Sequence, residues 1–359
     1  MASLASVTPG ASYPGLIKTI DNLALTGCSQ LSDGCGNALP ISVSPTVVAI
    51  GTSVSAAGSF SNVFGGVLNC SNGSCSLISG GTSNCALGAF SFVYGGSSNC
   101  IITSCSAMVN TYSSQIIRTG TGSAHLIMGG RFHTIGDACC QGTILGGQSN
   151  NIVSGRRGMI LGGASNTTYC SSSTVIGASL SSSQSGYSVI AGGVCNCTYG
   201  GFDSFIGGGD FNQSVGNVSG VMGGCLNIAQ TSTTVSGGCR NYAQGAFSSI
   251  NGGSSNCVTS GNSGIVAGCM NYAVGSFSSV VGGTNNCAIG AYSTIFGGQL
   301  NSATCANSAV FGCGITTSMA CALHTNRIVV TQLPSSSAGL PSGAMWYDPA
   351  AGNVVKYVP

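Results

Sequence analysis

The sequence predicts an all-β protein whose long central part is a parallel β-solenoid with coils of about 15 residues. Three features predict this fold. A pair of small residues, usually Gly-Gly, recurs about every 15 residues, an Asn stands four positions after its first member, and an apolar residue stands two positions before it. A period this short cannot hold a helix-plus-strand unit or a propeller blade, so each copy is expected to form one coil stacked on the previous one.

The residue two positions before each small pair is apolar and mostly β-branched, as at Val63, Ile144 and Val280. Parallel strands lie about 4.8 Å apart, so these residues are expected to form a continuous internal ladder. Four positions before the pair there is usually a Ser, such as Ser278, which gives the period-two pattern of a half-buried strand. About 17 such coils would make a rod of roughly 80 Å.

The small pair and the Asn are expected to form one corner of each coil. Glycine permits a positive φ and leaves no side chain where successive coils crowd. Asparagine tolerates the left-handed region, bonds nearby backbone and can bond the Asn of the next coil. A second Gly, such as Gly275, often follows four residues after the Asn and marks the other corner.

We expect this Asn column to be a structural turn ladder, with a ligand-binding ladder as the alternative. Its members are Asn69, Asn84, Asn99, Asn150, Asn166, Asn196, Asn212, Asn227, Asn241, Asn256, Asn271, Asn286 and Asn301.

The chain is expected to divide into three parts: residues 1–45 as an N-terminal β cap or attachment module, 46–315 as the solenoid, and 316–359 as a C-terminal β-hairpin module for capping or trimerisation. The turn-rich segment 33–37 is typical of a hairpin. In the last part, strands are expected at 327–332, 344–347 and 353–358. A solenoid leaves unpaired backbone at both ends, so capping is the expected role of the end modules, and attachment to a larger particle is the alternative.

Only 4% of the 359 residues are charged, and the net charge is +2. This composition argues against nucleic acid as a partner. No apolar run reaches about 18 residues, which argues against a membrane-spanning helix and against membrane insertion. The 59 glycines recur in fixed register beside β-branched residues, a pattern that indicates order rather than a disordered linker.

The segment from Gly275 to Gly290, GSFSSVVGGTNNCAIG, resembles the head repeats of trimeric autotransporter adhesins. The likeness extends over residues 46–315 and implies a left-handed parallel β-roll and a homotrimer of chains that lie side by side. The flanking segments 15–43 and 333–358 are similar to the first and last segments of phage and large-virus tail-fibre proteins. This second resemblance implies a location on the virion surface or otherwise outside a cell.

The twenty cysteines are an unusual feature of the composition. At equivalent positions of neighbouring coils, their Cα atoms would lie near the separation that a disulfide accepts. Oxidised pairs would cross-link coils or chains, whereas in the alternative cysteine serves as a small, mostly buried residue. Repeated Cys-x-x-Cys is lacking, so neither a metal site nor any cofactor is expected. The candidate disulfide or thiol ladder comprises Cys70, Cys85, Cys100, Cys225 and Cys239.

No reaction centre emerges, and no enzymatic activity is expected. Asp203 and Asp210, the two carboxylates closest in sequence, show no spacing that implies convergent geometry. Basic residues concentrate where the repeat becomes irregular, between residues 110 and 162. We expect a weakly cationic patch there that binds an anionic glycan or a partner subunit, with solvated loop charges as the alternative. The candidate binding patch consists of Arg118, Arg131, Arg156 and Arg157.

The predicted function is a non-enzymatic structural fibre or adhesin of a virus or phage, which presents a rigid trimeric solenoid for attachment or surface display. Its partners would be further copies of the chain, in a homotrimer or an end-to-end polymer, and a host-surface glycan or receptor. One alternative is a self-assembling extracellular filament stabilised by cysteine cross-links. Another is an ice-binding solenoid, but the sequence lacks a sustained Thr-x-Thr face.

Overall fold

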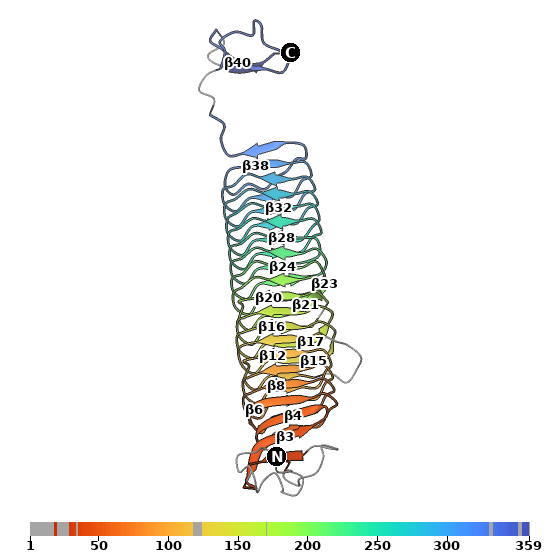
Figure 1. The fold of residues 1–359 in the computed structure, drawn as a ribbon. Coiled ribbons are helices and arrows are strands. Elements are labelled where there is room, and N and C mark those ends of the chain that lie inside the picture. The colour runs from red at the N-terminus through yellow and green to blue at the C-terminus, as the bar shows by residue number, and fades with distance from the viewer. Residues whose placement is uncertain are drawn as a thin grey trace, which may run out of the picture.

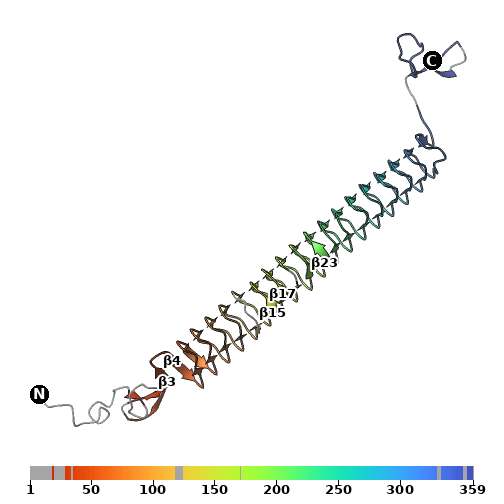
Figure 2. The same cartoon turned by 90° about the vertical axis from the view of Figure 1, so that its right-hand side faces the viewer.

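The computed structural model describes residues 18–19, 29–33, 35–117, 124–169, 171–329, 333–350 and 354–358. Every regular element in these ranges is a β-strand. The described residues therefore include no helix that could cross a membrane. The chain winds into about 18 parallel turns that stack along one axis as a long rod (Figures 1 and 2). The predicted all-β class, the parallel solenoid and the coil length of about 15 residues are confirmed.

Each regular coil contributes one strand to each of two parallel ladders. In the first ladder, Val280 pairs in register with Ile265 of the previous coil and Ile295 of the next. In the second ladder, Ala288 pairs in the same way with Ala273 and Ala303. A single residue per coil also forms an isolated parallel bridge to its equivalent in the next coil, and we call this line of residues the bridge column.

The strands of the first ladder are β4 (Val47–Thr52), β6 (Asn62–Val67), β8 (Leu77–Ser79), β10 (Phe92–Tyr94), β12 (Ala107–Val109), β14 (Leu126–Met128), β16 (Thr143–Leu145), β18 (Met159–Leu161), β20 (Thr174–Ile176), β22 (Val189–Ile190), β24 (Phe205–Ile206), β26 (Gly220–Val221), β28 (Thr234–Val235), β30 (Ser249–Ile250), β32 (Gly264–Ile265), β34 (Ser279–Val280), β36 (Thr294–Ile295), β38 (Ala309–Phe311) and β39 (Leu323–Thr325). Those of the second ladder are β5 (Ser55–Ala56), β7 (Cys70–Ser71), β9 (Cys85–Ala86), β11 (Cys100–Ile101), β13 (Gln115–Ile116), β15 (Thr134–Cys139), β17 (Asn151–Gly155), β19 (Thr167–Thr168), β21 (Ser182–Gly186), β23 (Cys197–Phe202), β25 (Gln213–Val215), β27 (Ile228–Ala229), β29 (Tyr242–Ala243), β31 (Cys257–Val258), β33 (Tyr272–Ala273), β35 (Cys287–Ala288) and β37 (Ser302–Ala303).

Four columns of buried side chains fill the rod. The first ladder contributes the mostly β-branched column that the sequence predicts, which is fully buried from Val63 to Val310. The ladder Asn and the Ser that precedes the small pair, such as Asn256 and Ser278, are buried as well. The fourth column, two residues after the Asn, was not predicted and holds small or β-branched residues such as Ala288. Because two of the four columns are polar, their side chains need hydrogen-bond partners inside the rod.

The two glycines of each pair have different roles, which the sequence pattern alone did not distinguish. At Gly253 φ is +86°, and an added Cβ would lie 2.1 Å from the carbonyl oxygen of Gly268 in the next coil. An added Cβ at Gly252 would meet no atom within 4 Å, and Ala267 occupies the equivalent position one coil later. In this part of the rod only the second position of the pair therefore requires glycine, whereas in coils nearer the N-terminus the first glycine also has a positive φ, as at Gly80 and Gly146.

Two non-glycine residues in each regular coil have a positive φ. One stands directly before the ladder Asn, as Ser255 does with φ of 57°, and the other stands directly before the buried Ser, as Phe277 does with the same φ. The ladder Asn tolerates the left-handed conformation but does not adopt it, since Asn256 and its equivalents have no positive φ. The preceding residue makes the turn, and the Asn side chain points into the rod.

Antiparallel strands flank the solenoid. At one end β1 (Lys18–Thr19) pairs with β2 (Ser29–Ser32), β2 with β3 (Ala38–Ser44), and β3 with β4. At the other end β40 (Met345–Asp348) and β41 (Val354–Tyr357) form a hairpin beyond the last coil (Figure 1). The strand expected at 327–332 is wrong for 327–329, which form no strand, and 330–332 lie outside the described residues.

Candidate functional site

The Asn ladder connects each coil to the next through a buried amide. The Nδ2 group of Asn256 donates to the carbonyl oxygen of Gly252 in its own coil and to that of Gly268 in the next coil, both at 3.0 Å. Its Oδ1 accepts the backbone N–H of Asn271 at 3.0 Å. One side chain thus makes three hydrogen bonds, two of which join successive coils.

The same bond from backbone N–H to Oδ1 joins most neighbouring members of the ladder. Direct bonding between side chains is less frequent, and one example is Asn99 Nδ2 to Asn84 Oδ1 at 3.0 Å. Every predicted ladder residue is at most 1% exposed. A column buried to this degree cannot present its amides to a ligand, and the geometry therefore favours the structural role over the ligand-binding one.

Two histidines replace members of the buried polar columns. His133 stands four residues after Gly129, where the repeat pattern places an Asn, and its Nδ1 accepts the backbone N–H of Asn150 at 3.3 Å. His125 stands in the Ser column, and its Nδ1 accepts the backbone N–H of Gly142 at 3.0 Å. Burial lowers the pKa of His133 below its ordinary value. The sequence analysis missed these roles, although the spacing from Gly129 identifies His133 as a ladder position.

Three of the candidate cysteines form a continuous column on the outer face of the second ladder. Cys70 pairs in register with Cys85, and Cys85 pairs in register with Cys100. All three are free thiols and partly exposed, whereas the residues that follow them in the strands point into the core. These three cysteines lie on the outer face, so they do not fit the alternative in which cysteine serves as a small, mostly buried residue.

Cys85 and Cys100 are register partners on the same face of the ladder and influence each other's protonation. Interaction with Cys100, together with burial, raises the pKa of the Cys85 thiol above its ordinary value. The same interaction lowers the pKa of Cys100 to about 7.

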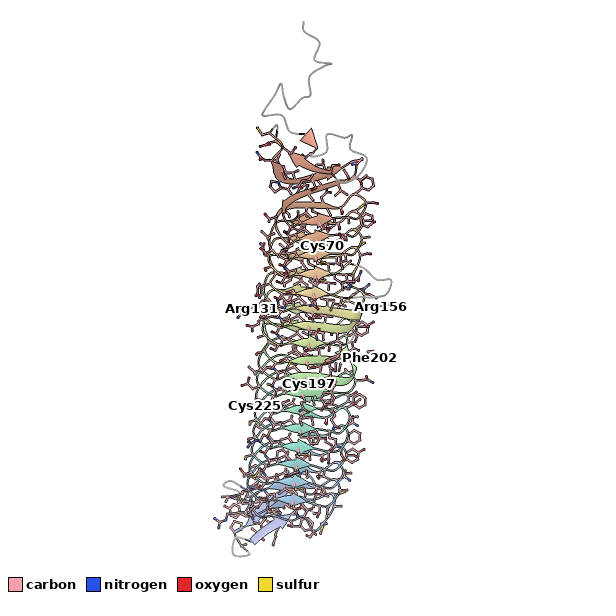
Figure 3. The ribbon with its side chains drawn as sticks, turned by 90° about the horizontal axis from the view of Figure 1, so that it is seen from below. Cys70, Arg131, Arg156, Cys197, Phe202 and Cys225 are labelled. Carbon is pink, nitrogen blue, oxygen red and sulfur yellow. The ribbon has the colours of Figure 1, made fainter. Side chains whose placement is uncertain are left out.

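The other two candidate cysteines lie elsewhere on the rod. Cys225 and Cys239 are neighbours in the bridge column, and both are free thiols that are partly exposed. Figure 3 shows Cys225 at one edge of the rod, away from the face that carries Cys70 and Cys197. The five candidate cysteines thus form two separate clusters instead of one ladder.

The structure does not assemble the predicted arginine patch. Arg131 lies in the bridge column, where its Nη2 donates to Gln148 Oε1 at 2.9 Å. Arg156 lies on the opposite side of the rod (Figure 3), in the turn that follows β17. The expectation of one patch is therefore wrong for these two residues, because the bridge column and this turn are opposite edges of the coil. Arg118 lies outside the described residues.

Arg156 and Arg157 form a smaller cationic site by themselves. They line an open cavity of about 350 Å³ together with Ser171, Ser172 and Tyr187. Both arginines are exposed, and Lys356–Asp348 is the only ion pair in the described part of the chain. The two guanidinium groups thus have no carboxylate partners. They can donate hydrogen bonds to an anionic group that lies between the serine hydroxyls and the tyrosine ring.

Apolar side chains are also arranged in columns on the outside of the rod. In the last coils of the first ladder, Val266, Val281, Phe296 and Phe311 occupy equivalent positions and are 41–64% exposed. Phe296 and Phe311 face each other with ring centroids 6.5 Å apart. These residues form a continuous apolar strip, which we call the C-terminal strip.

The described residues contain no group of three or more His, Cys, Asp or Glu side chains that could hold a metal ion. Asp210 lies in the bridge column, whereas Asp203 lies in the turn before β24, so the two carboxylates do not converge. No protein-family model matches the chain, and a comparison with curated protein sequences finds no match.

Proposed function

We propose that this protein is a non-enzymatic structural fibre, a rigid rod that holds its two end modules apart. Support comes from one observation above all, the stack of coils whose first-ladder strands pair in parallel from β4 to β39. Backbone bonds and the buried Asn ladder join each coil to the next along this stack. Such a rod resists bending and shear without needing a large apolar core.

We propose further that the working unit is a homotrimer of chains that lie side by side. The C-terminal strip supports association, because soluble monomers rarely expose contiguous apolar surface of this kind. Aromatic residues extend this apolar character onto a neighbouring column, where the rings of Phe277 and Tyr292 stack with centroids 4.9 Å apart. Two further copies of the chain are the partner that we propose for these surfaces.

We place the fibre on the surface of a virus or phage particle, where it serves for attachment or display. This part rests on the resemblance of the flanking segments to tail-fibre proteins. The cavity at Arg156 and Arg157 is the proposed contact for an anionic glycan of the host surface, since its two cationic groups lack carboxylate partners.

Two measurements on the full chain under reducing conditions test the assembly: sedimentation equilibrium, which gives its mass, and electron microscopy of the same sample. We expect a discrete mass of three times 35.1 kDa and rods of uniform length. A concentration-dependent series of masses with rods of variable length would favour the self-assembling filament instead. A mass that stays at 35.1 kDa at all concentrations would contradict both assemblies.

A further inference from the structure

We propose that Cys85 and Cys100 form a two-coordinate site for a soft monovalent metal ion, Cu(I) or Ag(I), on the outer face of the second ladder. The site is independent of the proposed fibre function. It rests on two observations: the register of the strands and the partial exposure of the thiols.

The register of the solenoid sets the distance between the two sulfur atoms. Cys85 and Cys100 are Cα partners in adjacent parallel strands, and both side chains leave the same face of the ladder. Adjacent strands lie about 4.8 Å apart, so side chains in equivalent rotamers have their sulfur atoms at about the same separation. A metal–thiolate bond is about 2.3 Å long, and a linear thiolate–metal–thiolate unit therefore spans about 4.6 Å. The strand spacing thus matches a bridging metal ion without any movement of the backbone.

A disulfide fits this spacing less well. Its two sulfur atoms lie only about 2.05 Å apart, so both side chains would have to rotate toward each other even though the Cα separation is within the accepted range. Disulfide formation would also remove two electrons and require an oxidant. Metal binding needs neither the movement nor the oxidant.

The number of available ligands selects the kind of metal. Zinc and iron sites normally use four ligands, and no group of three or more ligating side chains gathers anywhere in the described ranges. Soft thiolates favour Cu(I), and Cu(I) and Ag(I) are stable with two thiolate ligands in a line. Two cysteines on a flat ladder therefore fit a monovalent soft ion better than a divalent one.

The reaction involves protons but no electrons. Binding of one Cu(I) to the pair displaces the protons of the two thiols, which are released to solvent, and forms two sulfur–metal bonds. No electron is transferred, and the loaded site carries one negative charge.

Cys70 extends the column, so Cys85 is the thiol with a cysteine neighbour on both sides. Replacing Cys85 removes both adjacent pairs at once, whereas replacing Cys70 leaves the Cys85–Cys100 pair intact. Cys257 is a matched control in the same column, because its register partners are Tyr242 and Tyr272.

The test uses the full chain in its reduced state, without oxygen. Every variant also carries Cys225→Ser, so that Cys225 and Cys239 of the bridge column no longer form a second pair of neighbouring thiols. Cu(I) is titrated in competition with a coloured Cu(I) chelator. Even the outer hydrogen-bonding partners of metal ligands change affinity by about 10- to 100-fold, so we expect Cys85→Ser to weaken the tightest Cu(I) binding by more than about 100-fold. Cys70→Ser and Cys257→Ser should leave it unchanged.

X-ray absorption at the copper edge of the one-equivalent complex should show two sulfur neighbours, and loading should release protons at neutral pH. Circular dichroism of each variant verifies that the solenoid is intact. Equal Cu(I) affinity in the Cys85→Ser and Cys257→Ser proteins would overturn the proposal. So would equal weakening by Cys70→Ser, or a coordination shell of three or more ligands.

Discussion

Replacing a single ladder residue, Asn256→Ala, should loosen the rod locally by a calculable amount. The substitution removes three hydrogen bonds, two to the carbonyl oxygens of Gly252 and Gly268 and one from the backbone N–H of Asn271. Each bond of this kind contributes about 1 kcal/mol net, so the expected loss is about 3 kcal/mol. The buried N–H of Asn271 is left without an acceptor, and this adds to the cost.

Amide hydrogen exchange measures this effect coil by coil. In a solenoid each coil contacts only its neighbours, so the lost stability should appear mainly in the coils on either side of the substitution. Because a tenfold change corresponds to about 1.4 kcal/mol, exchange of the Asn271 amide should accelerate by about 100-fold. The coils around Asn84, far along the rod, should exchange at their original rates.

The exposed Asn251, which directly follows β30 in the same coil, provides the control. An Asn251→Ala protein removes the same side-chain atoms from the surface, where substitutions change stability by no more than about 0.5 kcal/mol. If Asn256→Ala and Asn251→Ala had the same exchange profile, the buried ladder would not hold the coils together. A uniform acceleration along the entire rod would refute the local, coil-by-coil description of its stability.

Three further predictions follow from the same geometry. Gly253→Ala should lower the free energy of unfolding by about 3 kcal/mol or more, because the new Cβ would collide with the next coil and φ is positive there. Gly252→Ala should leave this free energy unchanged or raise it by up to about 1 kcal/mol. Equal effects of the two substitutions in thermal unfolding would contradict the assigned roles. Burial lowers the pKa of His133, so the unfolded chain binds a proton more readily than the folded chain. The stability that neutral His133 contributes should therefore be complete above the unfolded pKa of about 6.5 and be lost as the pH falls below that value. His133→Asn should flatten this part of the pH profile, measured by urea unfolding between about pH 7 and pH 5, and an unchanged profile would exclude His133 as its source. Replacing both Arg156 and Arg157 by Ala should reduce retention on a sulfated polysaccharide column relative to Arg131→Ala, and equal retention would remove the cavity as an anion site.

The fold was predictable because stacking makes the sequence repeat visible. Most coils have a glycine where the next coil passes within contact distance, as at Gly253, and a buried Asn to satisfy the backbone there, as at Asn256. This pair of residues recurs in most coils and produces the period. The sequence also located the buried β-branched column that ends at Val310.

Other features left a weaker mark on the sequence. The left-handed residue before each Asn is Ser, Leu, Phe, Met, Cys, Arg or Asn in different coils, because its side chain lies outside the core, and no single residue type marks it. The second buried column alternates between residues as different as Ile152, Ser214 and Ala288, so no composition signal identifies it. Grouping Arg131 with Arg156 failed because residues close in sequence can lie on opposite edges of one coil.

The direct test of the central claim is an electron cryomicroscopy map of the purified protein. It should show a rod with an axial rise of about 4.8 Å per coil and a length of about 85 Å for about 18 coils, with Asn241, Asn256 and Asn271 one above another along its axis. A map in which these asparagines belong to separate hairpins, or in which no axial repeat near 4.8 Å exists, would contradict the stacked solenoid and the functions proposed for it.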